Sequence, residues 1–218
     1  MRVRSLIASN NKHKPEQYLS LEEGRTLVRL ARQAIASYLK DQTTIRPTNI
    51  TEKLGRKSGV FVTLNRTSPR ELRGCIGFPY PETPLANATI KAAIYAATED
   101  PRFPQVSQPE FNTGITIEVT VLTPPRVLDE QDREKLPDLI EVGRHGLIIE
   151  GHGTSGLLLP QVATEWNWDS TEFLTNCCLK ANLPPDSWLL EGTTVKVYEG
   201  EIFEEVKPAG EVRKKTGG

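Results

Sequence analysis

Arg73 and Cys75 are the residues of this sequence whose types and spacing best suit chemistry. They lie in the segment 72–77, Leu-Arg-Gly-Cys-Ile-Gly, where an extended backbone would put both side chains on one face. A guanidinium beside a thiol favours the thiolate, which is the nucleophilic form. The two glycines that bracket Cys75 indicate a bulge in the strand or a close approach of backbone or ligand. A reactive thiol and a small cysteine in a tightly packed place are both consistent with this pattern.

Other charged residues could complete a site around that thiol. Asp100 and Arg102 lie in a segment with two prolines that keep it extended, so they could clamp each other or a ligand. Glu118 lies on the non-aliphatic face of an expected strand, which faces either solvent or a cleft. A cysteine nucleophile needs a general base, and Glu118 and His145 are the available candidates.

Two further motifs are predicted to be structural. Residues 151–156 match the dinucleotide-binding pattern G-x-G-x-x-G, but strand-like residues and Pro160 follow, so we expect a hairpin turn. Cys177 and Cys178 are adjacent on the apolar stripe of an expected helix, which predicts two core positions. The spacing of cysteines and histidines predicts no metal site.

The elements that must position these residues mix helices and strands without a regular βαβ period, which predicts an α+β fold. Ser20 and Glu23 form a capping-box pattern that begins the first helix, and an Ala-rich helix follows Thr83-Pro84. The remaining expected elements are strands at 60–64, 72–77 and 115–122, a short helix at 129–135, a hairpin within 146–159, a helix from Asp169 or Ser170 to Ala181, and strands at 193–197 and 201–206.

The composition narrows the class of protein. Among 218 residues, Lys+Arg 27 and Asp+Glu 28 leave a net charge of -1, which argues against a nucleic-acid binder. The small, odd number of cysteines indicates a reducing compartment, and therefore a cytoplasmic protein. The longest apolar run, 92–97, is far shorter than the roughly 20 residues that span a bilayer. We expect a polar segment at 1–18, one domain at 19–206 and a flexible tail at 207–218.

The order of several motifs resembles the AMMECR family, named for the Alport syndrome, midface hypoplasia and elliptocytosis chromosomal region. The matching segments are 72–77, 100–104, Glu118 with 122–125, Gly143 with 145–147, Gly156 with 159–163, and Trp168 with 173–174, 178–181 and Trp188. They extend over roughly residues 19–206. The resemblance implies two unequal subdomains with antiparallel or mixed sheets flanked by helices, and places the cysteine motif near the groove between them.

The resemblance implies no particular reaction or cofactor. From the matching motifs we expect these catalytic residues: Arg73, Cys75, Glu118 and His145. The expected ligand contacts are Asp100, Arg102, Gln161 and Lys180. Prokaryotic relatives occur fused to, or encoded beside, Memo-type and radical-SAM proteins, which implies a shared pathway.

Two functional hypotheses follow. In the first, Cys75 is the centre of an enzyme or small-ligand site in which Arg73 and Arg102 attract an anionic group. In the second, the protein is a non-catalytic adaptor that holds a peptide or a partner protein. Trp188, Phe78 and Tyr80 would then be its aromatic anchors, although the same residues could be ordinary core.

Overall fold

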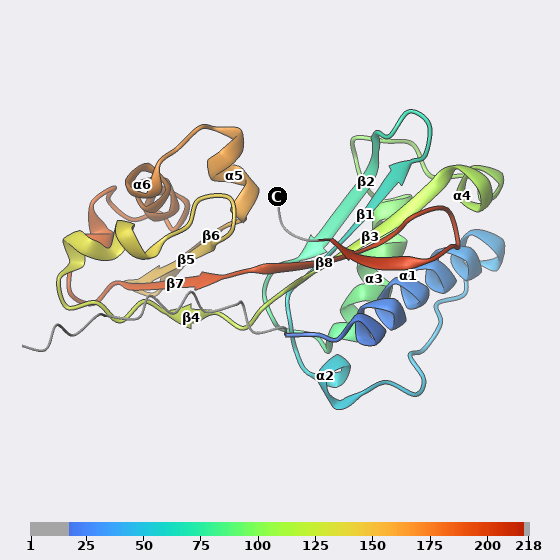
Figure 1. The fold of residues 1–218 in the computed structure, drawn as a ribbon, viewed down its shortest axis with the longest axis horizontal. Helices are drawn as coiled ribbons and strands as arrows, with labels where there is room; N and C mark the ends of the chain where they lie inside the picture. The colour runs from blue at the N-terminus through green and yellow to red at the C-terminus, as the bar shows by residue number, and fades with distance from the viewer. Residues whose placement is uncertain (1–17, 216–218) are drawn as a thin grey trace, which may run out of the picture.

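The structure is a computed structural model and describes residues 18–215. It contains two antiparallel sheets that lie side by side along the long axis of the molecule (Figure 1). Helices accompany each sheet without a βαβ alternation, so the α+β prediction is confirmed. None of the helices in this part of the chain is long and apolar enough to cross a membrane.

The larger sheet has five strands in the order β2-β1-β3-β8-β9. Its strands are β1 (Val60–Arg66), β2 (Leu72–Phe78), β3 (Ile115–Leu122), β8 (Gly200–Glu205) and β9 (Val212–Lys215). The helices of this five-stranded unit are α1 (Leu21–Asp41), α2 (Glu52–Gly55), α3 (Leu85–Thr98) and α4 (Gln108–Gly114).

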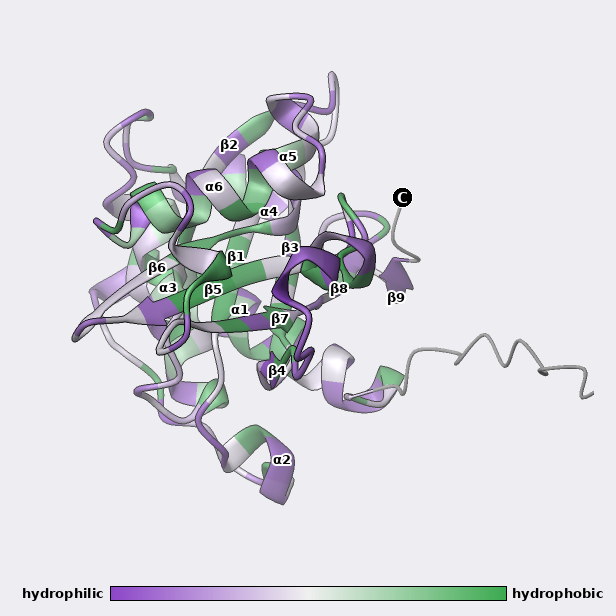
Figure 2. Ribbon diagram, turned by 90° about the vertical axis from the view of Figure 1, so that its left-hand side faces the viewer, coloured by the Kyte–Doolittle hydropathy of each residue, from purple (hydrophilic) through white to green (hydrophobic). Residues whose placement is uncertain are grey.

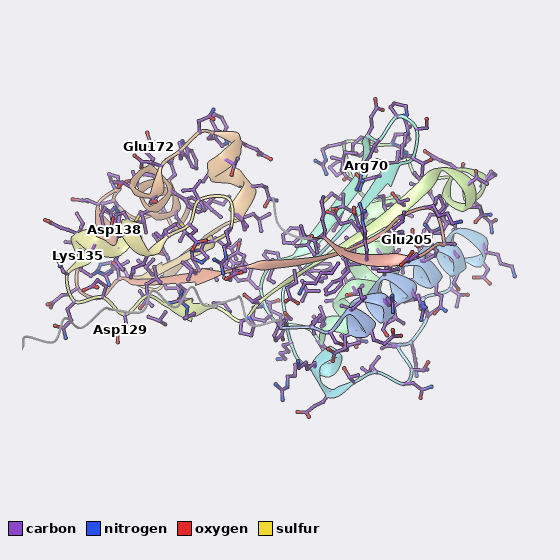
Figure 3. All side chains as sticks on the ribbon, viewed as in Figure 1. Arg70, Asp129, Lys135, Asp138, Glu172 and Glu205 are labelled. Atoms are coloured by element: carbon purple, nitrogen blue, oxygen red, sulfur yellow. The ribbon has the colours of Figure 1, made fainter. Side chains whose placement is uncertain are left out.

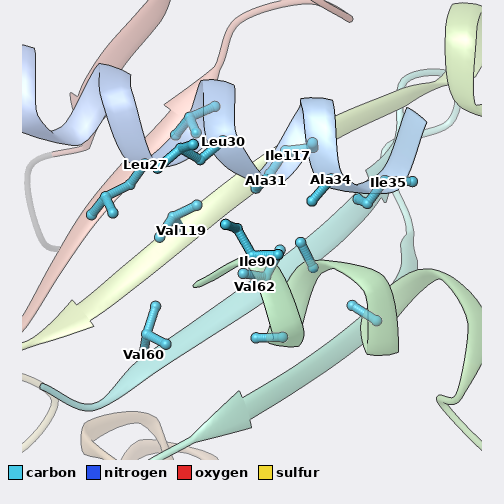
Figure 4. Packing of buried hydrophobic residues seen from close by; sticks show 14 of the residues in the cluster. Leu27, Leu30, Ala31, Ala34, Ile35, Val60, Val62, Ile90, Ile117 and Val119 are labelled. Atoms are coloured by element: carbon cyan, nitrogen blue, oxygen red, sulfur yellow. The ribbon is translucent and has the colours of Figure 1, made fainter. Parts of the chain in front are cut away.

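Alternation along the strands divides this sheet into two faces. Val60, Val62 and Leu64 are fully buried, and they face α1 and α3 together with Ile117 and Val119 of β3 (Figure 4). The outer face carries the residues between them, beginning with Phe61 and Thr63 on β1. The capping box that the sequence predicts is present: the Ser20 side chain accepts from the Glu23 N–H, and the Glu23 carboxylate accepts in return.

The smaller sheet has four strands in the order β4-β7-β5-β6. We call residues 126–198 the four-stranded unit. Its strands are β4 (Arg126–Val127), β5 (Gly146–Gly151), β6 (Thr154–Leu158) and β7 (Thr194–Tyr198). Its helices are α5 (Pro160–Glu165), α6 (Ser170–Lys180) and the 3-10 turns η1 (Arg133–Leu139) and η2 (Ser187–Leu189).

The chain crosses between the units where β3 leads to β4 and where β7 leads through Glu199 into β8 (Figure 1). At the junction Leu122, Ile148 and Tyr198 form a small apolar cluster, and Phe61 packs against it. Figure 2 shows the apolar residues concentrated on the central strands and the hydrophilic residues on α2 and β9 at the periphery.

Some predictions about elements were confirmed and others were wrong. Residues 152–153 form the turn of the β5–β6 hairpin, with φ of 50° at His152 and 79° at Gly153, so the glycine pattern is a hairpin turn. Cys177 and Cys178 are fully buried, as predicted. The short helix expected at 129–135 is wrong, because the residues that turn are 133–139 and they form the 3-10 segment η1.

The flexible tail expected after Val206 is also wrong. Residues 212–215 form β9 and pair with β8, so Arg213 lies opposite Glu204 and Lys214 opposite Phe203. The sequence did not predict this strand, because three of its four residues are basic and such a run is typical of a solvated segment. The carboxylates of β8 and β3 supply partners for those three cations.

Candidate functional site

Cys75 lies on the edge strand β2, on the outer face of the larger sheet. The register places Cys75 opposite Thr63, and the Thr63 hydroxyl lies 3.3 Å from Cys75 Sγ. Thr63 in turn lies opposite Glu118 on β3. Side chains directly opposite each other on one sheet face are neighbours, so a thiol, a hydroxyl and a carboxylate form a row across three strands.

Asp100 and Arg102 close the free edge of β2 at Cys75. The Cys75 N–H donates to Asp100 Oδ2 at 2.8 Å, and Arg102 Nη2 donates to the Cys75 carbonyl at 3.3 Å. Arg102 also binds the Asp100 carboxylate through two nitrogens, at 3.0 and 2.8 Å. The two residues therefore clamp each other, and together they clamp the backbone of Cys75.

This clamp presents a cation at the thiol. The Asp100 side chain is only 2% exposed, whereas 54% of the Arg102 side chain is exposed. Asp100, and to a smaller extent Cys75, raise the pKa of the Arg102 guanidinium, which is therefore coupled electrostatically to the cysteine. Arg102 keeps the pKa of Asp100 well below its usual range, and the two backbone N–H groups act in the same direction.

The prediction that the Arg73 guanidinium stands beside Cys75 is wrong. The pairing of β1 with β2 slips between Leu64 and Asn65, so the strict alternation from Cys75 back to Arg73 is broken. Arg73 is 3% exposed and binds Glu110 through Nε and Nη2, and its Nη1 donates to the Pro104 carbonyl at 2.8 Å. Arg73 anchors α4 and the 100–107 segment, and Arg102 occupies the place expected for it.

The contacts of Glu118 show what surrounds its face of the strand. It lies on the outer face between Thr63 and Glu204, its side chain is 15% exposed, and Lys215 of β9 donates to it at 3.2 Å. Glu204 next to it is 2% exposed and binds both Arg70 and Arg213. The outer face is therefore polar and charged beyond Cys75 rather than apolar.

His145 lies at the junction of the two units rather than in the Cys75 row. Its Nδ1 accepts the Glu141 N–H at 3.0 Å, and its Nε2 is 3.9 Å from Glu199 Oε1. Burial lowers the pKa of His145, so the neutral imidazole is favoured. The contacts that the structure gives His145 join it to residues 141 and 199, not to Cys75.

Gln161 and Lys180 are the predicted site residues on the four-stranded unit. Gln161 is exposed on α5, and Lys180 is exposed at the end of α6. A cavity of about 390 Å³ lies elsewhere, between the end of α1, residues 44–45 and the outer residues of α3, and none of the predicted site residues lines it. The structure thus joins Cys75, Asp100 and Arg102 by hydrogen bonds and places Glu118 two strands from Cys75 in the same row. It leaves Arg73, His145, Gln161 and Lys180 outside that group.

Comparison with known proteins identifies the family of this chain. A family model described as AMMECR1 matches residues 28–203. The chain belongs to the AMMECR1 family. Protein MK0488 of Methanopyrus kandleri is 51% identical over 197 residues, which cover 90% of this chain and 95% of the relative. Protein PF1979 of Pyrococcus furiosus is 54% identical over 198 residues, which cover 89% of this chain and 93% of the relative.

A solved structure of the AMMECR1 family agrees with the fold. The crystal structure of PH0010 from Pyrococcus horikoshii, a protein described as uncharacterised, matches with a TM-score of 0.72 at 51% identity. The match covers 91% of this chain and 99% of that chain. The family predicted from the cysteine motif and its companions is therefore confirmed.

Two residues that matter to this AMMECR1 chain were missed in the sequence. Thr63 alternates with the buried Val62 and Leu64, and that alternation places it on the outer face, but only the register identifies Cys75 as its neighbour. Trp166 is 68% exposed, whereas Trp188, the expected anchor, is 6% exposed and belongs to the core. Of the two interpretations of Trp188, the core position is confirmed and the anchor is wrong, because η2 turns that ring into the apolar cluster under α6.

The Asp100 clamp predicts a pH-dependent contribution to stability. Asp100→Asn should lower the free energy of unfolding at pH 7 by about 2 kcal/mol, because a carboxylate with several donors loses its charge. The folded pKa of Asp100 is depressed, so this contribution is complete above its ordinary value of 3.8 and declines as the pH falls further. Urea unfolding of both proteins at pH 7 and pH 3 measures it.

Asp129→Asn is the control for that experiment, because Asp129 is an exposed carboxyl outside the clamp. Its effect should stay within about 0.5 kcal/mol at either pH. An Asp100→Asn penalty of the same size at pH 3 and pH 7 would show that the carboxylate charge does not hold the clamp.

Proposed function

We propose that Cys75 is the centre of a site for an anionic small molecule or the anionic end of a peptide, with Arg102 as the group that binds the anion. One observation carries this proposal: the buried Asp100 binds Arg102 Nη2 at 2.8 Å and so holds the half-exposed guanidinium beside Cys75, whose carbonyl accepts from Nη2 at 3.3 Å. An arginine held by a buried acid keeps its remaining N–H groups, here those of Nη1, oriented toward an anion.

The neighbours of the sulfur support a role as nucleophile or ligand contact. The Thr63 hydroxyl lies 3.3 Å from Sγ, and the Arg102 guanidinium is coupled electrostatically to Cys75, so both can contact an anion that approaches the sulfur. We assign the role of proton acceptor to Glu118 rather than to His145, because Glu118 is the carboxylate next to Thr63 in the register. His145 is buried and occupied by the Glu141 N–H.

The same proposal includes a cytoplasmic location and a set of partner proteins. All three cysteines are free thiols, which suits the reducing cytoplasm. A groove at the cysteine motif and a shared pathway with Memo-type and radical-SAM proteins stay predictions from the family. An adaptor function without chemistry at Cys75 is the alternative, and the alkylation experiment below separates the two.

Alkylation of Cys75 by a charged and a neutral reagent tests the site. The rate constant for iodoacetate divided by that for iodoacetamide should fall about fivefold in Arg102→Gln, because about 1 kcal/mol of attraction for the anionic reagent is lost. Removing Arg102 also leaves the Asp100 carboxylate unpaired beside the incoming anion. Mass spectrometry of the tryptic peptide that contains Cys75 measures both rate constants.

Arg56→Gln is the matched control, because Arg56 is also a half-exposed arginine in an ion pair, with Glu52, but lies at the C-cap of α2. It should leave the ratio unchanged. Cys75→Ser gives the background, since Cys177 and Cys178 are fully buried. An equal ratio in wild type and Arg102→Gln would refute the anion site and favour the adaptor.

A further inference from the structure

The four-stranded unit carries a charge that the composition of the whole chain conceals. Residues 126–198 contain twelve Asp and Glu against six Lys and Arg, a net charge of -6, while the other residues carry a net charge of +5. The total of -1 is therefore the difference between an acidic unit and a basic remainder. An acidic unit favours a partner of positive charge.

The acidic unit also exposes a large aromatic side chain that its own fold holds in place. Trp166 ends α5 and is 68% exposed. Asn167 follows it with a φ of 54°, and this left-handed turn brings Trp168 back under Trp166. The two rings stack with centroids 6.0 Å apart and an interplanar angle of 17°. One face of Trp166 thus rests on Trp168 and the other faces solvent.

Residues 139–143 run beside this turn and extend its apolar surface. The Ser170 hydroxyl lies 3.4 Å from the Ile140 carbonyl, and the Gly143 backbone approaches the Thr164 side chain. Leu139 and Val142 of that segment are 41% and 38% exposed. We define the tryptophan patch as the exposed residues Leu139, Val142 and Trp166.

Carboxylates lie next in the sequence to both segments that form the tryptophan patch. Asp138 and Glu141 flank its first segment, and Glu165, Asp169 and Glu172 follow its second; Asp138 and Glu172 are labelled on this unit in Figure 3. Arg144 pairs with Glu141, and it also binds Glu199. An aromatic face attracts cations, and an acidic rim adds to that attraction.

We propose that the tryptophan patch docks a basic segment of another protein, with a Lys or Arg side chain against the free face of Trp166 and apolar residues on Leu139 and Val142. This surface is separate from the Cys75 row, because it lies on the other unit and uses none of the same residues. Charge complementarity and the exposed Trp166 ring, which stacks on Trp168, both favour this occupant. Aromatic side chains of this kind supply much of the affinity at protein interfaces.

A direct binding measurement tests the surface. The probe is a fluorescein-labelled peptide of alternating Arg and Leu without tryptophan, titrated with the full chain and followed by anisotropy, beside a peptide of alternating Glu and Leu. The Arg peptide should bind and the Glu peptide should not. Trp166→Ala should weaken binding about tenfold, and a double change, Asp138→Asn with Glu165→Gln, about fivefold.

Tyr95→Ala is the matched control, because Tyr95 is 38% exposed on α3 of the other unit. It should leave the affinity unchanged, and a thermal melt of each variant checks that the fold is intact. Equal affinity of wild type and Trp166→Ala for the Arg peptide would overturn the proposal.

A photo-crosslinking amino acid at position 166, used in cells that express the full chain, identifies the natural occupant. Adducts to a Lys- or Arg-rich segment of another protein, lost in the Asp138→Asn, Glu165→Gln background, would support the proposal. Adducts to a second copy, to residues 1–17 of this chain, or to acidic segments would overturn it. The alkylation ratio at Cys75 is unaffected by these changes, so the two proposals fail separately.

Discussion

Gly74→Ala should lower the free energy of unfolding by about 3 kcal/mol, because the new methyl group has no free space. A Cβ at this position would lie 2.1 Å from the carbonyl oxygen of Ala96 and 3.1 Å from its carbonyl carbon. Both atoms belong to the backbone of α3, so no side-chain rotation relieves the contact. Urea or thermal unfolding followed by circular dichroism measures the loss.

Two other glycines provide the comparison. A Cβ at Gly114 meets nothing within 4 Å, so Gly114→Ala should stay within about 0.5 kcal/mol of the wild type. A Cβ at Gly77 would lie 2.1 Å from the Phe61 ring, which is a side chain. Phe61→Leu should therefore recover part of the stability lost in Gly77→Ala. A Gly74→Ala protein as stable as Gly114→Ala would contradict the close approach of α3 to β2.

The close approach of Gly74 to the Ala96 carbonyl explains why the site depends on Gly74. The helix α3 ends at Thr98, and the chain then reaches Asp100 within two residues. A helix pushed away from β2 would take Asp100 and Arg102 with it, and Cys75 would lose both backbone partners. We therefore expect the iodoacetate preference to fall in any Gly74→Ala protein that still folds.

The sequence predicts best where a local rule decides the structure. The capping box at Ser20, the hairpin turn at 152–153 and the helix with Cys177 and Cys178 inside all depend on residues a few positions apart. The left-handed φ of 59° at Asn182, which follows α6, is of the same kind. Tertiary partners strengthen these elements without changing them.

The site was harder to predict because it depends on pairing across strands. One slip in register at Leu64 and Asn65 moves Arg73 from Cys75 to Glu110. The neighbouring Gly74 is consistent with a bulge, but it is equally consistent with a close approach, so residues 72–77 alone do not decide the slip. Asp100 and Arg102 were identified as a rigid pair, but their target is the edge of a strand 25 residues earlier. The exposures of Trp166 and Trp188 depend likewise on how two short turns pack against α6.

Removal of Arg32 should have the largest effect of any single charge change that we expect. Arg32 of α1 is 14% exposed in its side chain and binds Glu205, which is 3% exposed, through Nε and Nη2 at 2.5 Å each. Its Nη2 also donates to the Ile115 carbonyl at 2.7 Å. The pair therefore joins α1 to β8 and β3 inside the five-stranded unit.

Arg32→Met should lower the free energy of unfolding by about 4 kcal/mol, because it leaves the Glu205 carboxylate buried without its cation. The Ile117 N–H, at 3.0 Å, would be the main remaining donor to that carboxylate. Arg32→Lys should recover only part of the loss, since an ammonium cannot make the two parallel bonds of the guanidinium. Equilibrium urea unfolding at pH 7 measures all three proteins.

The double variant Arg32→Met, Glu205→Leu shows whether the loss of stability comes from the unpaired Glu205 carboxylate or from lost packing of Arg32. If the unpaired carboxylate causes the loss, removing it as well should restore most of the stability, because apolar replacements of a buried ion pair are often close to neutral. A double variant that is no more stable than Arg32→Met would instead place the loss in the packing of Arg32 over the Phe111 ring, 4.5 Å away. The interaction energy from this cycle thus decides whether α1 is held to the sheet by charge or by contact.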